Sequence, residues 1–439
     1  TGGGNLITTT GATFTGNIST AGISSVTAGT SNFVAGVNAG NSITSGGNYN
    51  TVVGDEAGTA LTTGGQNVAV GMNAMVGQTT ASYNVAVGQA ALSANTTGAN
   101  TTAVGWNSLT ANTTGASNTA VGSSALGANT TGGDITALGY NALRFNTTGG
   151  DNVAVGTEAL TANTTGGQNV AVGRQSLKSN TTASNNTALG NYSLFYNTTG
   201  GDNTAVGRSA LEDNTTGSAN TAVGMGSLES NTTGTLSTAI GRDALKSSTT
   251  ANSNTAVGRE ALRDTTTGGE NVAIGLNAMA GNTTGPRNTA IGKQCLQNLT
   301  TGDNNTAIGF MAGYNNNTNA TTTGYGNTLI GTYAHTNAAN TQYANALGQS
   351  IGASGGYTTL GSGGSDIRAS HGSTTWSTVS DERYKKDITT STAGLSFVNE
   401  LRPVTWNYKT LGELPTTFSA YEADSTEVFK NTQTNHGFI

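Results

Sequence analysis

The 17 residues NTAVGRSALEDNTTGSA, at positions 203–219, are one copy of a repeat that dominates this chain. Starting at Asn50, the sequence divides into 15 such units that end at Asn304 without an insertion. When the positions of a unit are numbered from 1 to 17, position 4 is aliphatic and position 5 is glycine in every unit. Position 9 is Leu or Met in all units but the first, which has Gly58, and positions 13 and 14 are Thr-Thr throughout.

This period indicates a β-solenoid. It matches neither helical nor heptad spacing, and the T-A-V-G alternation followed by glycine-rich punctuation favours short strands and turns. One unit then makes one coil, and we expect the aliphatic residues of positions 4 and 9 to stack as two ladders that form the core. Gly207 at position 5 permits a corner with positive φ or a close backbone approach. Asn214 and Gly217 suit a turn, because both residue types tolerate left-handed backbone.

The composition agrees with a repetitive β-structure and excludes several other classes. Glycine supplies 65 of 439 residues, and charged residues make up only 9%. The net charge is −6 and the chain has three prolines, whereas disordered chains usually have a high net charge and many prolines. The single Cys295 excludes an intrachain disulfide, the three histidines have no metal-site spacing, and no apolar run could span a membrane. We expect no cofactor and no metal. A pI near 5.0 without basic runs argues against a nucleic-acid partner.

Two large aliphatic side chains per coil make a thin core for an isolated chain, because ordering each coil costs considerable conformational entropy. Burial shared among several chains would offset that cost. We therefore expect a homo-oligomer, and fibrous β-proteins of this kind are commonly trimers.

Units such as NTAVG and NTAIG, over residues 50–309, resemble the repeats in the head domains of trimeric autotransporter adhesins. The resemblance implies a left-handed parallel β-roll assembled as a homotrimer. The period of this chain is longer than is usual for coils of that family. On either side of the 50–304 repeat, we expect an irregular Gly/Thr-rich β lead-in over 1–49 and a degenerate end of the rod over 305–365.

Beyond residue 366 the composition changes, and we expect a linker and the start of a small α+β domain over 366–439. A helix is predicted at Ser391–Leu401 and a strand after Pro403. This segment resembles the endosialidase-type intramolecular chaperone found at the C-terminus of phage tail spikes and fibres. The residues that match the family pattern are Ser380, Asp381, Arg383, Lys385, Lys386, Ile388, Leu401, Arg402, Pro403, Val404, Trp406, Gly437, Phe438 and Ile439. The family pattern continues past the point where Ile439 stands, so we expect this domain to be partial.

The resemblance implies that the domain drives trimerisation and then removes itself by cutting the bond adjoining Ser380. It places the nucleophile on Ser380 and its helper on Lys385, with Asp381 and Arg383 as supporting members of the motif. A serine hydroxyl needs a base, and a lysine desolvated in an assembled site can lose its proton near neutral pH. Such a reaction is a single turnover per chain, and no turnover enzyme is expected. The alternative is a solvated charged segment, SDERYKKD, without chemistry.

Two surface features leave alternatives open. Basic residues recur at position 6, where they could bind an anionic glycan or simply aid solubility. Aromatic residues cluster around Tyr140 and Phe145, and again around Tyr192 and Phe195, with Trp106 apart. Such side chains could stack on sugars or pack between chains.

Three functions remain at this stage. The first is the shaft of a phage tail fibre or tail spike, located in the virion, which contacts a host-surface receptor, glycans included, and other tail proteins. The second is a trimeric adhesin on a bacterial cell surface, although such proteins end in a membrane anchor where this chain has a chaperone-like segment. The third is the shaft of a polysaccharide depolymerase whose catalytic domain is not in this sequence.

Overall fold

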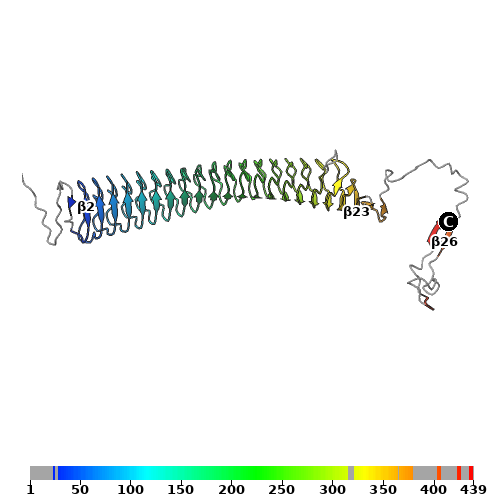
Figure 1. Ribbon diagram of the computed structural model, residues 1–439, viewed down its shortest axis with the longest axis horizontal. Coiled ribbons are helices and arrows are strands. Elements are labelled where there is room, and N and C mark those ends of the chain that lie inside the picture. The colour runs from blue at the N-terminus through cyan, green and yellow to red at the C-terminus, as the bar shows by residue number, and fades with distance from the viewer. Residues whose placement is uncertain are drawn as a thin grey trace, which may run out of the picture. The chain divides into compact units, whose positions relative to one another are not determined.

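The computed structural model describes residues 23–24, 28–314, 321–363, 365–378, 403–406, 423–426 and 435–438. The chain divides into two compact units, 1–379 and 380–439. The first is a parallel β-solenoid in which successive coils stack along one axis (Figure 1). No helix occurs among the described residues, so the all-β class and the one-repeat coil predicted from the sequence are confirmed.

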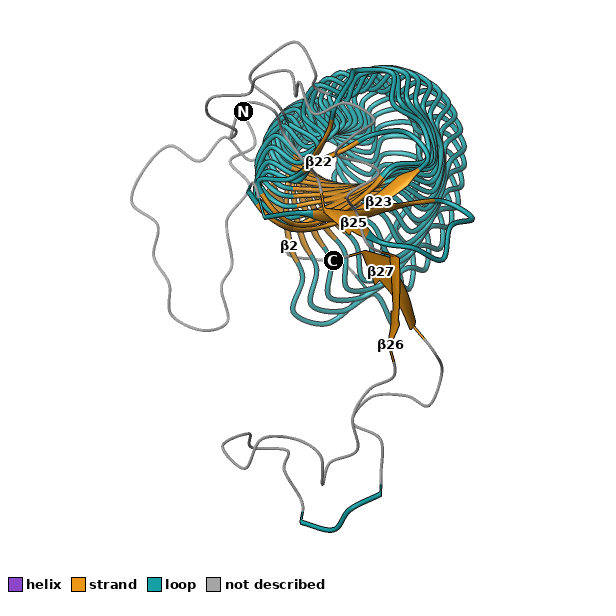
Figure 2. Ribbon diagram, turned by 90° about the vertical axis from the view of Figure 1, so that its right-hand side faces the viewer, coloured by secondary structure: helices purple, strands orange, loops and turns teal. Residues whose placement is uncertain are grey.

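Each coil contributes one short strand, and the strands form a sheet along one side of the solenoid (Figure 2). Within the regular repeat, successive strands are parallel and in register one repeat apart along the chain, so that Thr204 pairs with Thr221 and Ala205 with Ala222. The strands of the regular repeat are β3 (Thr51–Val53), β4 (Val68–Val70), β5 (Val85–Val87), β6 (Thr102–Val104), β7 (Thr119–Val121), β8 (Thr136–Leu138), β9 (Val153–Val155), β10 (Val170–Val172), β11 (Thr187–Leu189), β12 (Thr204–Val206), β13 (Thr221–Val223), β14 (Thr238–Ile240), β15 (Thr255–Val257), β16 (Val272–Ile274), β17 (Thr289–Ile291) and β18 (Thr306–Ile308).

The expected aliphatic ladder at position 4 does not lie in the core of the chain. Side chains alternate between the two faces of a strand, so positions 2 and 4 share a face and position 3 takes the other. Ala205 at position 3 is fully buried, whereas Thr204 and Val206 are only half-buried on the outer face. The inward position of the strand holds a single methyl group in most coils. The large aliphatic residue that follows it therefore points outward.

The second expected ladder, at position 9, is confirmed. From Met75 to Leu296 the Leu or Met at this position is buried in every coil, next to the small residue of position 8. Leu211 and Ala210 illustrate the pair, and both are fully buried. The core of each coil thus combines one long aliphatic side chain with the small side chains of positions 3 and 8.

The corners require unusual backbone conformations. Gly207 has φ +132°, and a Cβ on it would lie 2.6 Å from the carbonyl oxygen of Gly224 in the next coil, so only glycine fits. Three further positions adopt left-handed backbone with ordinary side chains. In the same coil these are Ser209, Leu211 and Ala219, with φ between +52° and +57°. The sequence predicted the glycine corner but not a left-handed leucine.

Two ladders of buried asparagine run through the interior, at positions 1 and 12. The Asn214 amide nitrogen donates to Asn197 Oδ1 (2.7 Å) in the preceding coil and to the Gly217 carbonyl (2.9 Å) in its own. Asn203 donates to the same Gly217 carbonyl (2.9 Å), and its backbone N–H donates to Asn186 Oδ1 (3.0 Å). Buried amides are stable only when such bonds satisfy them, and the repeat supplies the partners coil after coil.

These contacts correct the turn prediction for Asn214 and Gly217, since neither residue has a positive φ. Asn214 is required for its buried amide. Gly217 is required for space, because a Cβ there would lie 2.4 Å from both Asn214 Oδ1 and the Gly234 carbonyl oxygen.

The regular stack changes at both ends. At the first, β1 (Ile23–Ser24) pairs antiparallel with β2 (Phe33–Ala35), which is parallel to β3. At the other, β18 is followed by parallel strands at irregular spacing and then by an antiparallel pair, β23–β24, to which β25 adds. The strands of this end are β19 (Thr328–Ile330), β20 (His335–Thr336), β21 (Asn345–Gln349), β22 (Gly352–Ala353), β23 (Tyr357–Ser362), β24 (Ile367–Ser370) and β25 (Ser377–Thr378).

In the second unit, the described residues include β26 (Pro403–Trp406), which pairs antiparallel with β27 (Asn435–Phe438). The strand predicted after Pro403 is therefore present. The helix predicted at 391–401 lies outside the described residues.

The asparagine ladder of position 12 is interrupted at Ser248, and this gap generates a prediction. Asn231 Oδ1 and Ser248 Oγ are buried without a hydrogen-bond partner. The variant Ser248→Asn should donate to Asn231 Oδ1 and to the Ala251 carbonyl, as Asn180 does to Asn163 and Ala183. It should stabilise the fold by about 1 kcal/mol. The thermal midpoint followed by circular dichroism measures this.

The matched control is Asn163→Ser, which opens the same gap in an intact part of the ladder and should lower the midpoint. A lower midpoint in Ser248→Asn would contradict the role assigned to the ladder.

Candidate functional site

The outer face of the sheet is the most extended surface feature of the solenoid. The side chains at positions 2 and 4 of each repeat point out of this face. Position 2 is Thr or Val, and position 4 is a larger aliphatic residue. The most exposed position-4 side chains have 36% to 41% of their surface accessible, and they run along most of the rod. They are Val87, Val121, Val172, Leu189, Ile240, Ile274, Ile291, Ile308, Ile330 and Leu347. A contiguous apolar stripe of this kind is typical of a surface that another protein covers.

A second surface, formed by positions 6 to 11, lies beyond the glycine corner and carries most of the charges. Lys178 Nζ binds Glu158 Oε2 at 2.8 Å across two coils. Lys246 lies 3.2 Å from Glu229 and 3.4 Å from Asp243. These cations are at position 10 and the acids at positions 7 and 10, so ion pairs recur at fixed places. We call this surface the charged face.

Two carboxylates on the charged face have shifted pKa values of opposite sign. The pKa of Glu158 is lowered, chiefly because its carboxylate accepts hydrogen bonds from Lys178 and Gln175. The pKa of Asp213 is raised, first by partial burial and then by the nearby charges of Glu212 and Glu229. Ionised Asp213 therefore opposes folding, whereas ionised Glu158 favours it.

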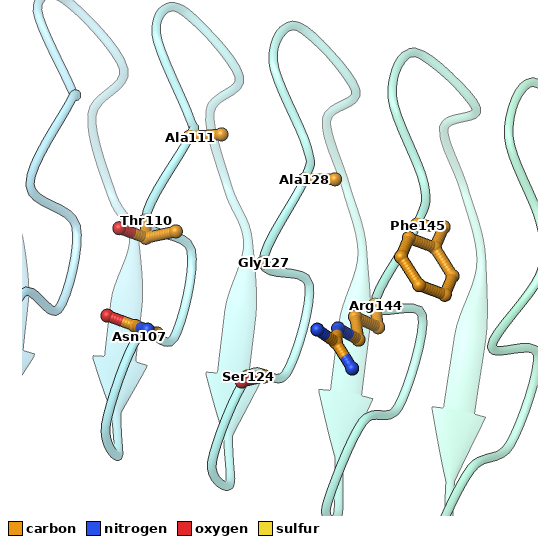
Figure 3. A pocket seen from close by; sticks show the side chains of 8 residues that line it. All are labelled: Asn107, Thr110, Ala111, Ser124, Gly127, Ala128, Arg144 and Phe145. Atoms are coloured by element: carbon orange, nitrogen blue, oxygen red, sulfur yellow. The ribbon is translucent and has the colours of Figure 1, made fainter.

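The charged face also contains a hollow of about 350 Å³. Three consecutive coils line it, and Figure 3 shows the Arg144 side chain reaching back toward the coil that holds Ser124 and Gly127. The guanidinium carbon of Arg144 lies 5.0 Å from the centre of the Phe145 ring. The lining residues are Asn107, Thr110, Ala111, Ser124, Gly127, Ala128, Arg144 and Phe145.

A separate aromatic cluster forms around Phe195, whose ring centre lies 5.7 Å from that of Tyr192 and 4.5 Å from that of Tyr196. Both cations beside this cluster have partners. Arg174 Nη1 donates a hydrogen bond to the Tyr192 hydroxyl (2.9 Å), and Lys178 forms an ion pair with Glu158. The basic residues of position 6, such as Arg208, are exposed.

Cys295 occupies position 8, which is otherwise Ala or Ser, and it is buried. Burial raises the pKa of its thiol to about 12, so the thiolate is scarce at neutral pH. Among the described residues, no group of three or more His, Cys, Asp or Glu side chains could hold a metal ion. The same part of the chain contains no helix long and apolar enough to cross a membrane.

The chain is therefore a β-solenoid protein with a separate C-terminal unit that begins at Ser380. Residues 380–439 match the family model described as "Chaperone of endosialidase". That match covers the segment for which the sequence suggested this family. No curated protein and no solved structure matches the chain.

The residues predicted to carry self-cleavage, Ser380, Asp381, Arg383 and Lys385, lie outside the described residues, and their roles remain predictions. Sequence reasoning missed the outward direction of position 4 and the hollow beside Arg144. A signal for the hollow exists, because Gly127 is the one glycine at position 10 in the 15 units.

The raised pKa of Asp213 leads to a prediction about pH. A carboxyl whose pKa is higher in the folded than in the unfolded state costs stability as the pH rises through that interval. Asp213→Asn removes the cost, so it should raise the thermal midpoint near pH 7 and leave it unchanged at about pH 3, where the aspartate is already protonated.

Glu158→Gln is the control of opposite sign. It should lower the midpoint near pH 7, because it removes a carboxylate that the fold stabilises. A lower midpoint for Asp213→Asn at neutral pH would show that its charge is compensated.

Proposed function

We propose that this protein is the shaft of a homotrimeric extracellular fibre, of the phage tail-fibre or tail-spike type, that takes part in attachment to a host surface. The observation that carries the proposal is the apolar outer face of the sheet. It runs along the solenoid, and the family model described as a chaperone of endosialidase matches the segment that follows.

The copies pack through the outer sheet face. Each strand offers one Thr or Val and one larger aliphatic side chain there, and the in-register pairing repeats this pattern at about 4.8 Å per coil. Burial of half-exposed aliphatic surface contributes roughly 25 cal/mol per Å², so many small contacts along a rod sum to a stable assembly. The thin internal core is then supplemented by a second one between chains.

The C-terminal segment acts in assembly. It holds the chains together while the parallel coils find their register. Once the oligomer has formed, Ser380 and Lys385 cut the bond adjoining Ser380 and release the chaperone. The mature product is a solenoid in the virion whose surface meets the receptor.

The oligomer is tested with the full chain by sedimentation and light scattering. The double variant Ile240→Lys/Ile274→Lys places two charges on the outer sheet face and should dissociate the assembly, while circular dichroism stays unchanged. The matched control, Thr216→Lys/Thr250→Lys, changes two exposed turn residues with the same spacing of two coils and should remain trimeric. A monomeric wild-type protein, or an intact trimer in the first variant, would refute the proposed packing.

Self-cleavage is tested in the complete reading frame by following intact mass over time. Ser380→Ala and Lys385→Ala should keep the chain intact and still assemble, whereas Lys386→Ala should be cleaved almost normally. The reaction should begin only after oligomerisation, because a lysine exposed to water keeps a pKa of about 10.4 and is a poor base. Normal cleavage of Ser380→Ala would remove the nucleophile from the proposal.

A further inference from the structure

The hollow on the charged face contains Arg144, which has no counter-charge, whereas the other cations of its position in the repeat form ion pairs. Lys178 at position 10 pairs with Glu158 of the preceding coil. Lys246, at the same position, pairs with Glu229 of the preceding coil and with Asp243 of its own.

Arg144 also occupies position 10, but the three places equivalent to those acids hold neutral residues, Ser124, Gly127 and Asn141. In the described part of the chain the Arg144 guanidinium forms no ion pair and no hydrogen bond. Its charge is therefore available to a ligand.

Two more polar side chains face the hollow without a partner. The Asn107 amide and the Ser124 hydroxyl line it, and neither forms a side-chain hydrogen bond to another described residue. At the equivalent place of another coil, the Gln175 amide donates to Glu158 Oε2 at 2.6 Å. Around Arg144, therefore, a guanidinium, an amide and a hydroxyl all remain available to one ligand.

The walls of the hollow suit a ring with an apolar side. Phe145 is about half exposed and holds the Arg144 guanidinium against its face. The lining also includes Ala111, Ala128 and Gly127, whose side chains are small or absent. Trp106 and Tyr140 stand exposed at position 6 of the two flanking coils. Aromatic rings beside groups that donate and accept hydrogen bonds are suited to stacking on the apolar side of a sugar ring.

We propose that this hollow binds an acidic sugar residue of a glycan chain. The carboxylate pairs with the Arg144 guanidinium, whose fork of N–H donors matches a carboxylate. The sugar hydroxyls bond to Asn107, Ser124 and Thr110, and the ring lies against Phe145. A volume of 350 Å³ is within the range of small-molecule sites, about 300–1,000 Å³, and the hollow is open to solvent, so a polymer can continue beyond it.

This site is independent of the proposed packing between chains. It lies at positions 7, 10 and 11, beyond the glycine corner that separates it from the outer sheet face at positions 2 and 4. A failure of the trimer prediction leaves the binding test intact, and the converse also holds.

Binding is tested by calorimetry at low ionic strength with the full chain. Hexagalacturonate and a mannuronate hexamer are the acidic probes, and maltohexaose is the neutral one. The wild-type protein should bind at least one acidic probe and not maltohexaose. Arg144→Gln should weaken that binding about ten-fold or more, since a hydrogen-bonded ion pair contributes roughly 1.5–3 kcal/mol.

Two more variants use the repeat itself as a guide to substitutions that fold. Ser124 has the same left-handed backbone as Glu158 and lies in the same place relative to Arg144 as Glu158 does relative to Lys178. The variant Ser124→Glu should therefore form an ion pair with Arg144 inside the chain. Gly127→Phe fills the hollow with a phenylalanine, a residue that another coil has at the same position 10, namely Phe195. A Cβ at Gly127 makes only ordinary contacts. Both variants should lose binding and keep the wild-type thermal midpoint or exceed it.

Arg208→Gln is the matched control, because it removes another exposed arginine, several coils away, whose guanidinium has no hydrogen-bond partner among the described residues. Its binding should equal that of the wild type. The proposal is overturned if neither acidic probe binds, if maltohexaose binds equally well, or if Arg144→Gln and Arg208→Gln weaken binding to the same extent.

Discussion

Backbone hydrogen bonds between equivalent places of successive coils hold this solenoid together. The N–H groups of one coil donate both to the preceding coil and to the following one. Gly207 N–H donates to Leu189 of the coil before, whereas Leu211 N–H donates to Ser227 of the coil after. Because these bonds join equivalent places of neighbouring coils, a residue inserted within a strand or a corner would displace the partners of its coil on both sides. The strict period, the glycine corners and the paired asparagines all follow from this requirement.

The same requirement explains an interior that is unusually polar for its size. A coil with one long aliphatic side chain cannot exclude water by apolar bulk alone, so Asn203 and Asn214 fill the remaining space with amides that bond to the coils beside them. Left-handed leucines such as Leu211 cost about 1–2 kcal/mol each relative to ordinary backbone. The stack tolerates that cost because the conformation turns the side chain inward in every coil while preserving the hydrogen bonds.

The period, the invariant glycine and the leucine of position 9 were enough to predict a solenoid, since they constrain register and a corner. They were not enough to place Val206, because alternation alone does not say which face of a strand is inside; the narrowness of the coil decides it. Asn214 was assigned to a turn for its backbone preference, but its amide is what the fold uses. The hollow depends on Ser124 and Arg144, which lie in neighbouring coils and which only the coil geometry brings together. The C-terminal motif was recognisable because it is a spaced set of specific residues, and a family model matches the same segment.

The antiparallel strands at the two ends of the stack have a consequence for how such a rod grows. A parallel stack without them would present a bare strand edge at each end, and edges of that kind recruit further strands from other molecules. Here β1 runs against β2 at one end, and β24 and β25 are added beyond β23 at the other, so the regular parallel strands are not the outermost strands of the stack at either end. Within the chain, whole repeat units can be gained or lost without disturbing more than their immediate neighbours. The length of the rod is therefore set by the number of repeats that the gene encodes, and each duplicated repeat adds about 4.8 Å.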